Sequence, residues 1–180
     1  MSGAVVVIGV TGCGKSTLAA ALAAALGWAF IDGDALEPPV YVTNTKAGER
    51  PDDADRELRF SKVSRELARH HGAGVVVAYS ALLRRYRDAI REQAGNVHFV
   101  LPEVAGDRIA ARIEKSASHQ MPAGLIDSEL ATFDQPETDE NAIVVDGTLP
   151  TGEQVRRVLD ALSRRGIVPA ADRQQGQQQQ

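Results

Sequence analysis

The sequence predicts an α/β fold in which a five-stranded parallel sheet carries helices on both of its faces. Five short apolar runs alternate with segments of helical pattern, which is typical of a parallel sheet. The first run leads into a glycine-rich phosphate-binding motif, and that motif leads into an alanine- and leucine-rich segment. With 180 residues, of which 43% are hydrophobic and 24% charged, the chain has the size and composition of one globular domain.

The phosphate-binding motif G-x-x-x-x-G-K-[ST] occupies residues 9–16, GVTGCGKS. Residues 4–8 are a β-branched run that predicts a buried strand, and residues 17–26 have a strong helix-forming composition. A strand, a tight turn and a helix N-terminus direct backbone N–H groups toward one point, where a polyphosphate binds. We expect Lys15 to reach the β- and γ-phosphates of ATP and the Ser16 hydroxyl to ligate Mg²⁺. The residues expected to bind the nucleotide in this loop are Gly12, Cys13, Gly14, Lys15, Ser16 and Thr17.

Two carboxylates follow the second predicted strand, which covers residues 28–31. Asp32 and Asp34 stand on either side of Gly33, just past the carboxyl end of the strand, where open α/β sheets bind their ligands. We expect Asp32 to face the metal ion and Asp34 to face the hydroxyl group that accepts the phosphoryl group. The alternative for Asp34 is a cap of the next helix.

The remaining strands and helices continue the alternation. Residues 37–55 are loop-like, and the helical pattern that follows at 55–71 carries several basic residues, of which Arg56 and Arg59 lie nearest the loop and are expected to face the substrate. The further predicted strands are 74–79, 97–101 and 142–147 with its turn, and the further predicted helices are 80–94 with Ser80 as its cap, 103–116, 125–133 and 151–165.

Two segments are predicted to lie outside this regular alternation. Residues 116–124 are small, polar and interrupted by Pro122 and Gly124, which predicts a mobile lid over the phosphates at about residues 113–124. Residues 169–180 are rich in glutamine and are expected to form a disordered tail. The sequence therefore predicts a single P-loop domain over residues 1–168, followed by this tail.

Charge and cysteine content exclude several other classes of protein. The net charge of −4 provides no overall basic field for nucleic acid. The single cysteine, Cys13, excludes an intrachain disulfide and a cysteine-based metal site. Its place at a helix N-terminus predicts a lowered thiol pKa, with either a redox role or simply a small side chain that fits the loop. The apolar run 4–10 is too short to span a membrane, and no signal peptide is recognised, so we expect a cytoplasmic enzyme.

In several segments, at matching spacing, the sequence resembles the P-loop gluconokinases, relatives of shikimate kinase. Residues 80–88, SALLRRYRD, resemble the S-A-L-K-R-x-Y-R-D of that family, and residues 125–136 resemble its L-L-x-S-Q-x-x-T-L-E-x-P. The resemblance also includes the phosphate-binding loop, the run from Asp32 through Arg56, and the lid histidine at His119. It covers about residues 4–165. It implies a nucleoside-monophosphate-kinase-like fold with strand order 2-3-1-4-5 and a lid, the use of ATP and Mg²⁺, and often a homodimer.

The resemblance implies transfer of the γ-phosphoryl group of ATP to a hydroxyl of a sugar acid, from gluconate to 6-phosphogluconate, or of a related polyol. Asp34 would orient the acceptor hydroxyl and accept its proton, and Arg112, supported by Lys115, would neutralise charge from the lid side. For Arg84 and His119 the alternatives are a surface salt bridge and an exposed lid residue. The expected catalytic residues are Lys15, Asp34 and Arg112, the metal ligands are Ser16 and Asp32, and the substrate-binding residues are Asp34, Glu37, Arg56, Arg59, Ser80, Arg84 and His119.

Most departures from the pattern of that family fall in the expected acceptor site. Glu37, Asn44 and Leu83 stand where the family has histidine, lysine and lysine, so positive charge is lost where the carboxylate of a sugar acid would bind. Three alternatives therefore stay open: a shikimate-kinase-like activity, a cyclitol or amino-sugar kinase, and a nucleotide-binding protein without catalysis. The segment 80–82 argues against the first, because shikimate kinases have three glycines there.

Overall fold

A parallel sheet forms the central layer of the protein, in a computed structural model that describes residues 3–36, 53–70, 72–115 and 123–167. Its strand order is β2-β3-β1-β4-β5, as the resemblance implied, and all four strand pairings are parallel. The strands are β1 (Ala4–Val7), β2 (Ala29–Asp32), β3 (Val75–Ala78), β4 (Val97–Glu103) and β5 (Ile143–Asp146).

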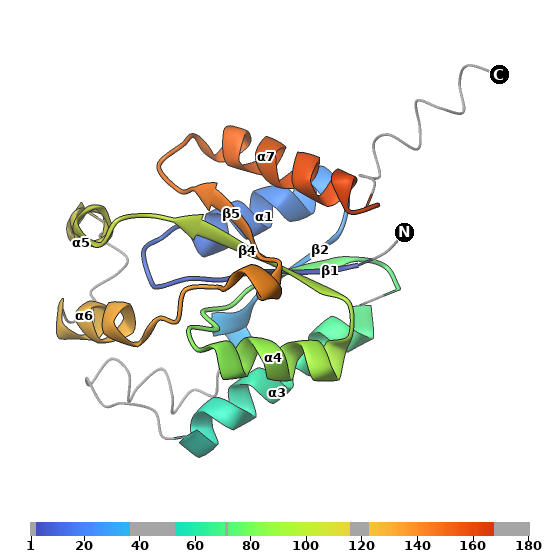
Figure 1. Cartoon of the computed structure of the whole chain (residues 1–180), viewed down its shortest axis with the longest axis horizontal. Helices are drawn as coiled ribbons and strands as arrows, with labels where there is room; N and C mark the ends of the chain where they lie inside the picture. The colour runs from blue at the N-terminus through green and yellow to red at the C-terminus, as the bar shows by residue number, and fades with distance from the viewer. Residues whose placement is uncertain (1–2, 37–52, 71, 116–122, 168–180) are drawn as a thin grey trace.

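Helices cover both faces of this sheet, and two more lie beside the edge at which the strands end (Figure 1). The helices α1 (Lys15–Leu26) and α7 (Thr151–Arg164) share one face, and α3 (Asp53–His70) and α4 (Arg84–Ala94) share the other. The helices at the edge are α5 (Gly106–Lys115) and α6 (Ala123–Thr132), and two short 3₁₀ turns are η1 (Gly33–Leu36) and η2 (Thr138–Glu140). None of the helices in the described ranges is both long and apolar enough to cross a membrane.

The central strand β1 is buried on both sides, which explains its unbroken run of β-branched residues. Val5 and Val7 pack into the cluster that holds the buried residues of α1 and α7, whereas Ala4 and Val6 pack into the cluster that holds those of α3 and α4. Strand β3 on one side of β1 is fully buried as well. The loop that follows β1 is therefore attached to a fully buried part of the sheet.

The start of α4 is the clearest difference from the sequence-based expectation. The helix begins at Arg84 and not at Ser80, which does not cap it. Its first N–H, that of Arg84, instead donates to Asp134 Oδ2 at 3.1 Å. Ala81 has a left-handed φ of +37°, which is incompatible with a helix at that residue. A carboxylate from a distant segment thus fulfils the role that the sequence assigned to Ser80.

Other boundaries differ by a few residues. Strand β4 continues to Glu103, so α5 begins at Gly106 and not at 103. Residues 113–115 belong to α5 and residues 123–124 belong to α6, so both ends of the predicted lid are helical. The rest of that lid, the predicted loop at 37–52 and the predicted tail lie outside the described residues. The single-domain arrangement and the lid stay predictions.

Candidate active site

The phosphate-binding loop joins β1 to α1 at the edge of the sheet where the strands end. Three of its glycines have positive φ: +129° at Gly9, +83° at Gly12 and +102° at Gly14. At Gly12 a Cβ would lie 2.8 Å from the Cδ1 of Ile113 on α5, so both conformation and space require glycine there. Because α1 begins at Lys15, the N–H groups of its first turn have no partner within the helix and are directed toward the loop. No acidic residue in this first turn offsets the positive end of the helix. The loop therefore forms a site for an anion.

The two side chains expected to act on the phosphates are placed by this loop. Lys15 is half-buried, and its Nζ donates to the Val10 carbonyl across the loop at 3.0 Å. Ser16 lies on the exposed side of the first turn of α1. Asp32, the last residue of β2, lies in register with Ala78 of β3, which in turn lies in register with Val7, the last residue of β1. Asp32 thus ends its strand at the same level at which β1 enters the loop.

Arg112 of α5 reaches the phosphate-binding loop. Its Nη1 donates to the Cys13 carbonyl at 3.3 Å, and its Nη2 donates to the Gly147 carbonyl at 2.8 Å. One guanidinium group therefore connects the phosphate-binding loop with the turn that follows β5. The structure brings Arg112 together with Lys15 and Ser16 around one loop, and Arg112 also has a fixed place through its two carbonyl partners.

Glu129 of α6 also contacts this loop, and sequence reasoning did not select it. The Thr11 N–H donates to Glu129 Oε2 at 2.7 Å, and the Thr11 hydroxyl donates to Oε1 at 3.1 Å. The two residues are 118 positions apart in the sequence. A carboxylate therefore lies against an N–H group of the anion-binding loop.

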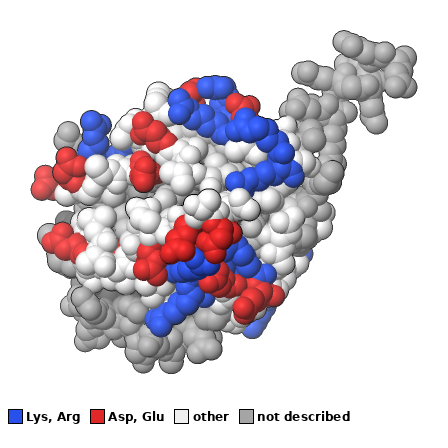
Figure 2. All heavy atoms as spheres, viewed as in Figure 1, with Lys and Arg blue, Asp and Glu red and all other residues white. Residues whose placement is uncertain are grey.

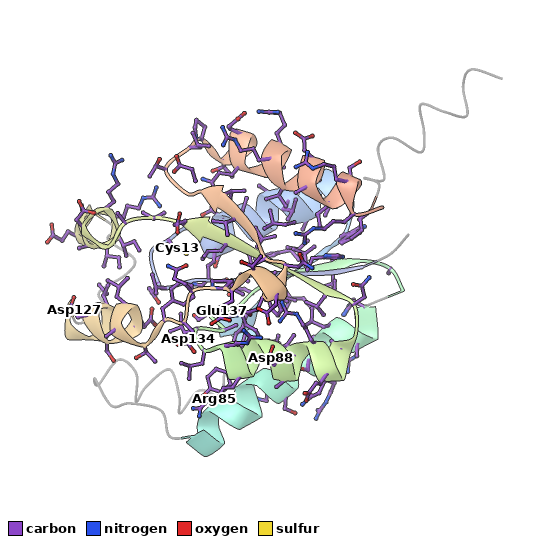
Figure 3. The ribbon with its side chains drawn as sticks, viewed as in Figure 1. Cys13, Arg85, Asp88, Asp127, Asp134 and Glu137 are labelled. Atoms are coloured by element: carbon purple, nitrogen blue, oxygen red, sulfur yellow. The ribbon has the colours of Figure 1, made fainter. Side chains whose placement is uncertain are left out.

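The thiol of Cys13 is buried within the loop, and the expectation of a lowered pKa was wrong. Cys13, labelled in Figure 3, is 3% exposed. It packs with Val10, Ile109 and Ile113. Burial raises the pKa of the thiol, and this effect exceeds the lowering by the charge and the backbone hydrogen bond of Lys15. Sequence reasoning considered only the helix N-terminus, whereas desolvation by α5 decides the direction.

We therefore expect Cys13 to react slowly with iodoacetamide in the folded protein. At pH 8 its rate constant should be at least about tenfold below that of the same thiol in urea, because both access and the thiolate fraction are reduced. Mass spectrometry of alkylated protein over time measures both rates. Equal rates in the folded and the unfolded protein would contradict the burial and would restore the redox hypothesis.

The segment after β3 lies next to the loop and carries two of the expected acceptor residues. The Gly9 N–H donates to the Ser80 carbonyl at 3.2 Å. Arg84 lies at the start of α4, where its guanidinium donates to Asp139 Oδ2 at 2.5 Å and to Glu137 Oε2 at 2.7 Å. These charges form part of a mixed acidic and basic cluster over α4 and η2 (Figure 2). Arg84 is thus held in a salt bridge, the alternative considered from the sequence, and its role toward a substrate stays a prediction.

A buried ion pair between α4 and η2 holds the same segment in place. Arg87 of α4 is 0% exposed, and it donates to both carboxylate oxygens of Glu140, from Nε at 2.6 Å and from Nη2 at 2.8 Å. Its Nη1 donates to the Ala81 carbonyl at 3.1 Å and to the Leu82 carbonyl at 3.3 Å. Arg87 therefore fixes the backbone on which Ser80 and the left-handed Ala81 lie.

Comparison with known proteins identifies the family. A gluconokinase from Gluconobacter oxydans (strain 621H) is 40% identical over 146 residues, which cover 79% of this chain and 81% of that protein. The chain belongs to the gluconokinase family. Residues 5–136 also match the AAA domain family, consistent with the phosphate-binding loop in this gluconokinase-family chain.

Two solved structures share the fold of this gluconokinase-family protein. The crystal structure of a gluconokinase from Sinorhizobium meliloti 1021 matches with a TM-score of 0.82 at 37% identity, covering 90% of this chain and 92% of that one. An unliganded sugar kinase from Janibacter sp. HTCC2649 matches with a TM-score of 0.84 at 33% identity, covering 91% and 95%. The family and the fold predicted from the sequence are confirmed.

Several of the site residues that the sequence predicted lie outside the described part of the chain. Glu37 and His119 are among them, as are the side chains of Asp34, Arg56 and Arg59. Their roles, like that of the Lys115 side chain, stay predictions.

Sequence reasoning missed Arg87, although Arg87, Ile90 and Ala94 share the buried face of α4 and their spacing could have indicated a buried arginine.

Proposed function

We propose that this protein transfers the γ-phosphoryl group of ATP to a hydroxyl of gluconate, producing 6-phosphogluconate. The observation that carries the proposal is the 40% identity with a gluconokinase over 146 residues, combined with an intact phosphate-binding loop. Family membership by itself supports the use of ATP. The acceptor is the finer part of the proposal, because the chain departs from the motifs of the family at Glu37, Asn44 and Leu83.

The loop would bind the phosphates and stabilise the charge that develops during transfer. The N–H groups of residues 12–17 and the Lys15 ammonium would hold the phosphate oxygens. Arg112, whose guanidinium already lies 3.3 Å from the Cys13 carbonyl, would neutralise charge from the side of α5. Asp34 would orient the acceptor hydroxyl and accept its proton late in the transfer.

The oxygen donors near the loop fit Mg²⁺, the metal ion that the family implies. Ser16 offers a hydroxyl and Asp32 a carboxylate, and Mg²⁺ in kinase sites takes few protein oxygens beside phosphates and water. When bound, the ion supplies positive charge that offsets the charge of the phosphate oxygens. The cytoplasmic location and the homodimer implied by the resemblance stay predictions.

A second acceptor class is supported by the charges around α4. Leu83 stands at the N-cap of α4 where the family motif has lysine, and Arg84 is already paired with Asp139 and Glu137. Fewer free positive charges are then available for the carboxylate of a sugar acid. A neutral polyol, a cyclitol or an amino-bearing acceptor would suit such a site.

An assay of ADP release decides between these acceptors. The purified protein is incubated with ATP and Mg²⁺ and with gluconate, related sugar acids, shikimate, neutral polyols, cyclitols and amino sugars. We expect gluconate to give the highest kcat/KM, and Asp34→Asn to lower kcat at least about a hundredfold on the same acceptor.

Each result of this assay has a distinct meaning. Turnover of a neutral or amino-bearing acceptor but not of gluconate would replace gluconate while retaining the phosphoryl transfer. Turnover of shikimate would favour the shikimate-kinase-like alternative. ATP binding without turnover on any acceptor would support a nucleotide-binding protein without catalysis.

A further inference from the structure

The contact between Glu129 and Thr11 has no role in the phosphoryl transfer proposed above. Both carboxylate oxygens are used: one accepts the Thr11 N–H at 2.7 Å and the other accepts the Thr11 hydroxyl at 3.1 Å. Glu129 comes from α6, and Thr11 is the third residue of the phosphate-binding loop. A charged acceptor at this distance from an N–H donor forms a strong hydrogen bond.

The surroundings of Thr11 favour negative charge. Its preceding residue, Val10, holds the Lys15 ammonium through its carbonyl, and the N-terminus of α1 faces the same loop. After the larger effect of burial, the charge of Glu129 also raises the pKa of the Cys13 thiol in the same loop. The carboxylate thus uses the same positive field that the loop offers to the phosphates of a nucleotide.

We propose that Glu129 is an internal anion of the phosphate-binding loop that competes with the terminal phosphates of the nucleotide and so sets nucleotide affinity according to phosphate number. The proposal rests on the use of ATP by this kinase, and it is independent of the acceptor. When ATP binds, its phosphates bring further negative charge toward the Glu129 carboxylate. ATP then binds more weakly than it would if the side chain beside the loop were uncharged. The affinity for AMP, which has a single phosphate, is affected least.

Substitution by glutamine separates the charge of Glu129 from its hydrogen bonds. The amide oxygen of glutamine accepts the Thr11 N–H as the carboxylate does, and the side chain has almost the same shape. If Glu129 only anchors α6 to the loop, Glu129→Gln should change nucleotide binding little. If Glu129 acts as an internal anion, the same substitution should change nucleotide binding, because it removes the charge.

Asp127 offers a matched control on the same helix. It is exposed and lies in the middle of α6, where Figure 3 labels it. Asp127→Asn removes the same charge from α6 but leaves the contact with Thr11 in place. Comparison of the two variants distinguishes a local effect of Glu129 from a general change in the net charge of the protein.

Isothermal titration calorimetry on the full chain without an acceptor tests the proposal, with ATP, ADP and AMP, each in the presence and absence of Mg²⁺. We expect Glu129→Gln to lower the Kd for ATP roughly tenfold, to lower that for ADP less, and to change that for AMP less than twofold. Asp127→Asn should change each of the three values less than twofold.

Three results would overturn the proposal: an unchanged or raised Kd for ATP in Glu129→Gln, an equal change for AMP, or an equal change in Asp127→Asn. A Kd for ATP that is raised only when Mg²⁺ is present would identify Glu129 as a metal ligand instead. Since no acceptor is present, a protein that fails to phosphorylate gluconate still answers this question.

Discussion

Replacing Lys15 with methionine is expected to lower kcat for ATP-dependent phosphorylation by about a thousandfold or more. The Lys15 ammonium lies 3.0 Å from the Val10 carbonyl, inside the loop that receives the phosphates. Methionine keeps the length and most of the apolar volume of the side chain but removes the charge that offsets the transferring group. Steady-state kinetics of ADP release measure the loss, and thermal unfolding shows whether the fold is retained.

Lys62 provides the matched control for this substitution. Its Nζ donates to the Leu36 carbonyl at 3.3 Å, so it is also a lysine bound to a backbone carbonyl, but it lies on α3. Lys62→Met should keep kcat within about threefold, because no phosphate-binding role is assigned to it. A kcat for Lys15→Met within tenfold of the original would mean that the loop stabilises the transferring group without this ammonium.

Replacing Arg87 with methionine is expected to lower the free energy of unfolding by about 3–5 kcal/mol. Glu140, with a side chain only 1% exposed, would keep its charge without its bidentate partner. The carbonyls of Ala81 and Leu82 would lose the guanidinium donor at the same time. Urea unfolding followed by circular dichroism measures the loss.

Two further variants separate the buried charge from simple packing. The double substitution of Arg87 and Glu140 by methionine should recover part of the lost stability, because no unpaired buried charge remains. Arg156→Met on α7 removes an exposed arginine that pairs with Glu153, and it should have a far smaller effect. If the double variant were as unstable as Arg87→Met, the packing of the guanidinium and not its charge would be the cause.

The same pair predicts a dependence of stability on pH. Burial alone would raise the pKa of Glu140, but the hydrogen bonds from Arg87 and the Glu137 N–H and the charges of Arg87 and Arg91 lower it below its ordinary value of 4.5. The unfolded chain therefore takes up the proton first as the pH falls. The stabilising contribution is complete above about pH 4.5 and is lost as the pH falls through the lower, folded-state pKa. The double methionine variant should show a shallower loss over this range.

The sequence predicted the parts of the fold that local pattern determines. The strand, the glycine-rich loop and the helix at residues 4–26 follow from β-branched residues, glycines and alanines that act within a few positions of one another. The strand order came with the family resemblance. Lys15 and Ser16 lie in the loop because they are part of the motif itself. Arg112, which the family resemblance implied, contacts the Cys13 carbonyl of this loop, and its role stays a prediction.

The contacts that local pattern does not determine were missed. Asp134, 50 positions away in the sequence, accepts a hydrogen bond from the first N–H of α4. This contact, and not a cap by Ser80, provides the partner for that N–H. Arg87 and Glu140 are 53 positions apart, and Glu129 and Thr11 are 118. Such pairs depend on how α6, η2 and α4 come together, which periodicity along one element does not describe. The raised pKa of the Cys13 thiol follows likewise from the packing of α5.

The hydrogen bond from the Gly9 N–H to the Ser80 carbonyl has a thermodynamic consequence. It joins the first residue of the nucleotide loop to the segment that we expect to bind the acceptor. If each substrate alters this shared contact, the binding of one changes the affinity for the other. The factor must be the same in both directions, because the free energy of the ternary complex does not depend on the order of binding.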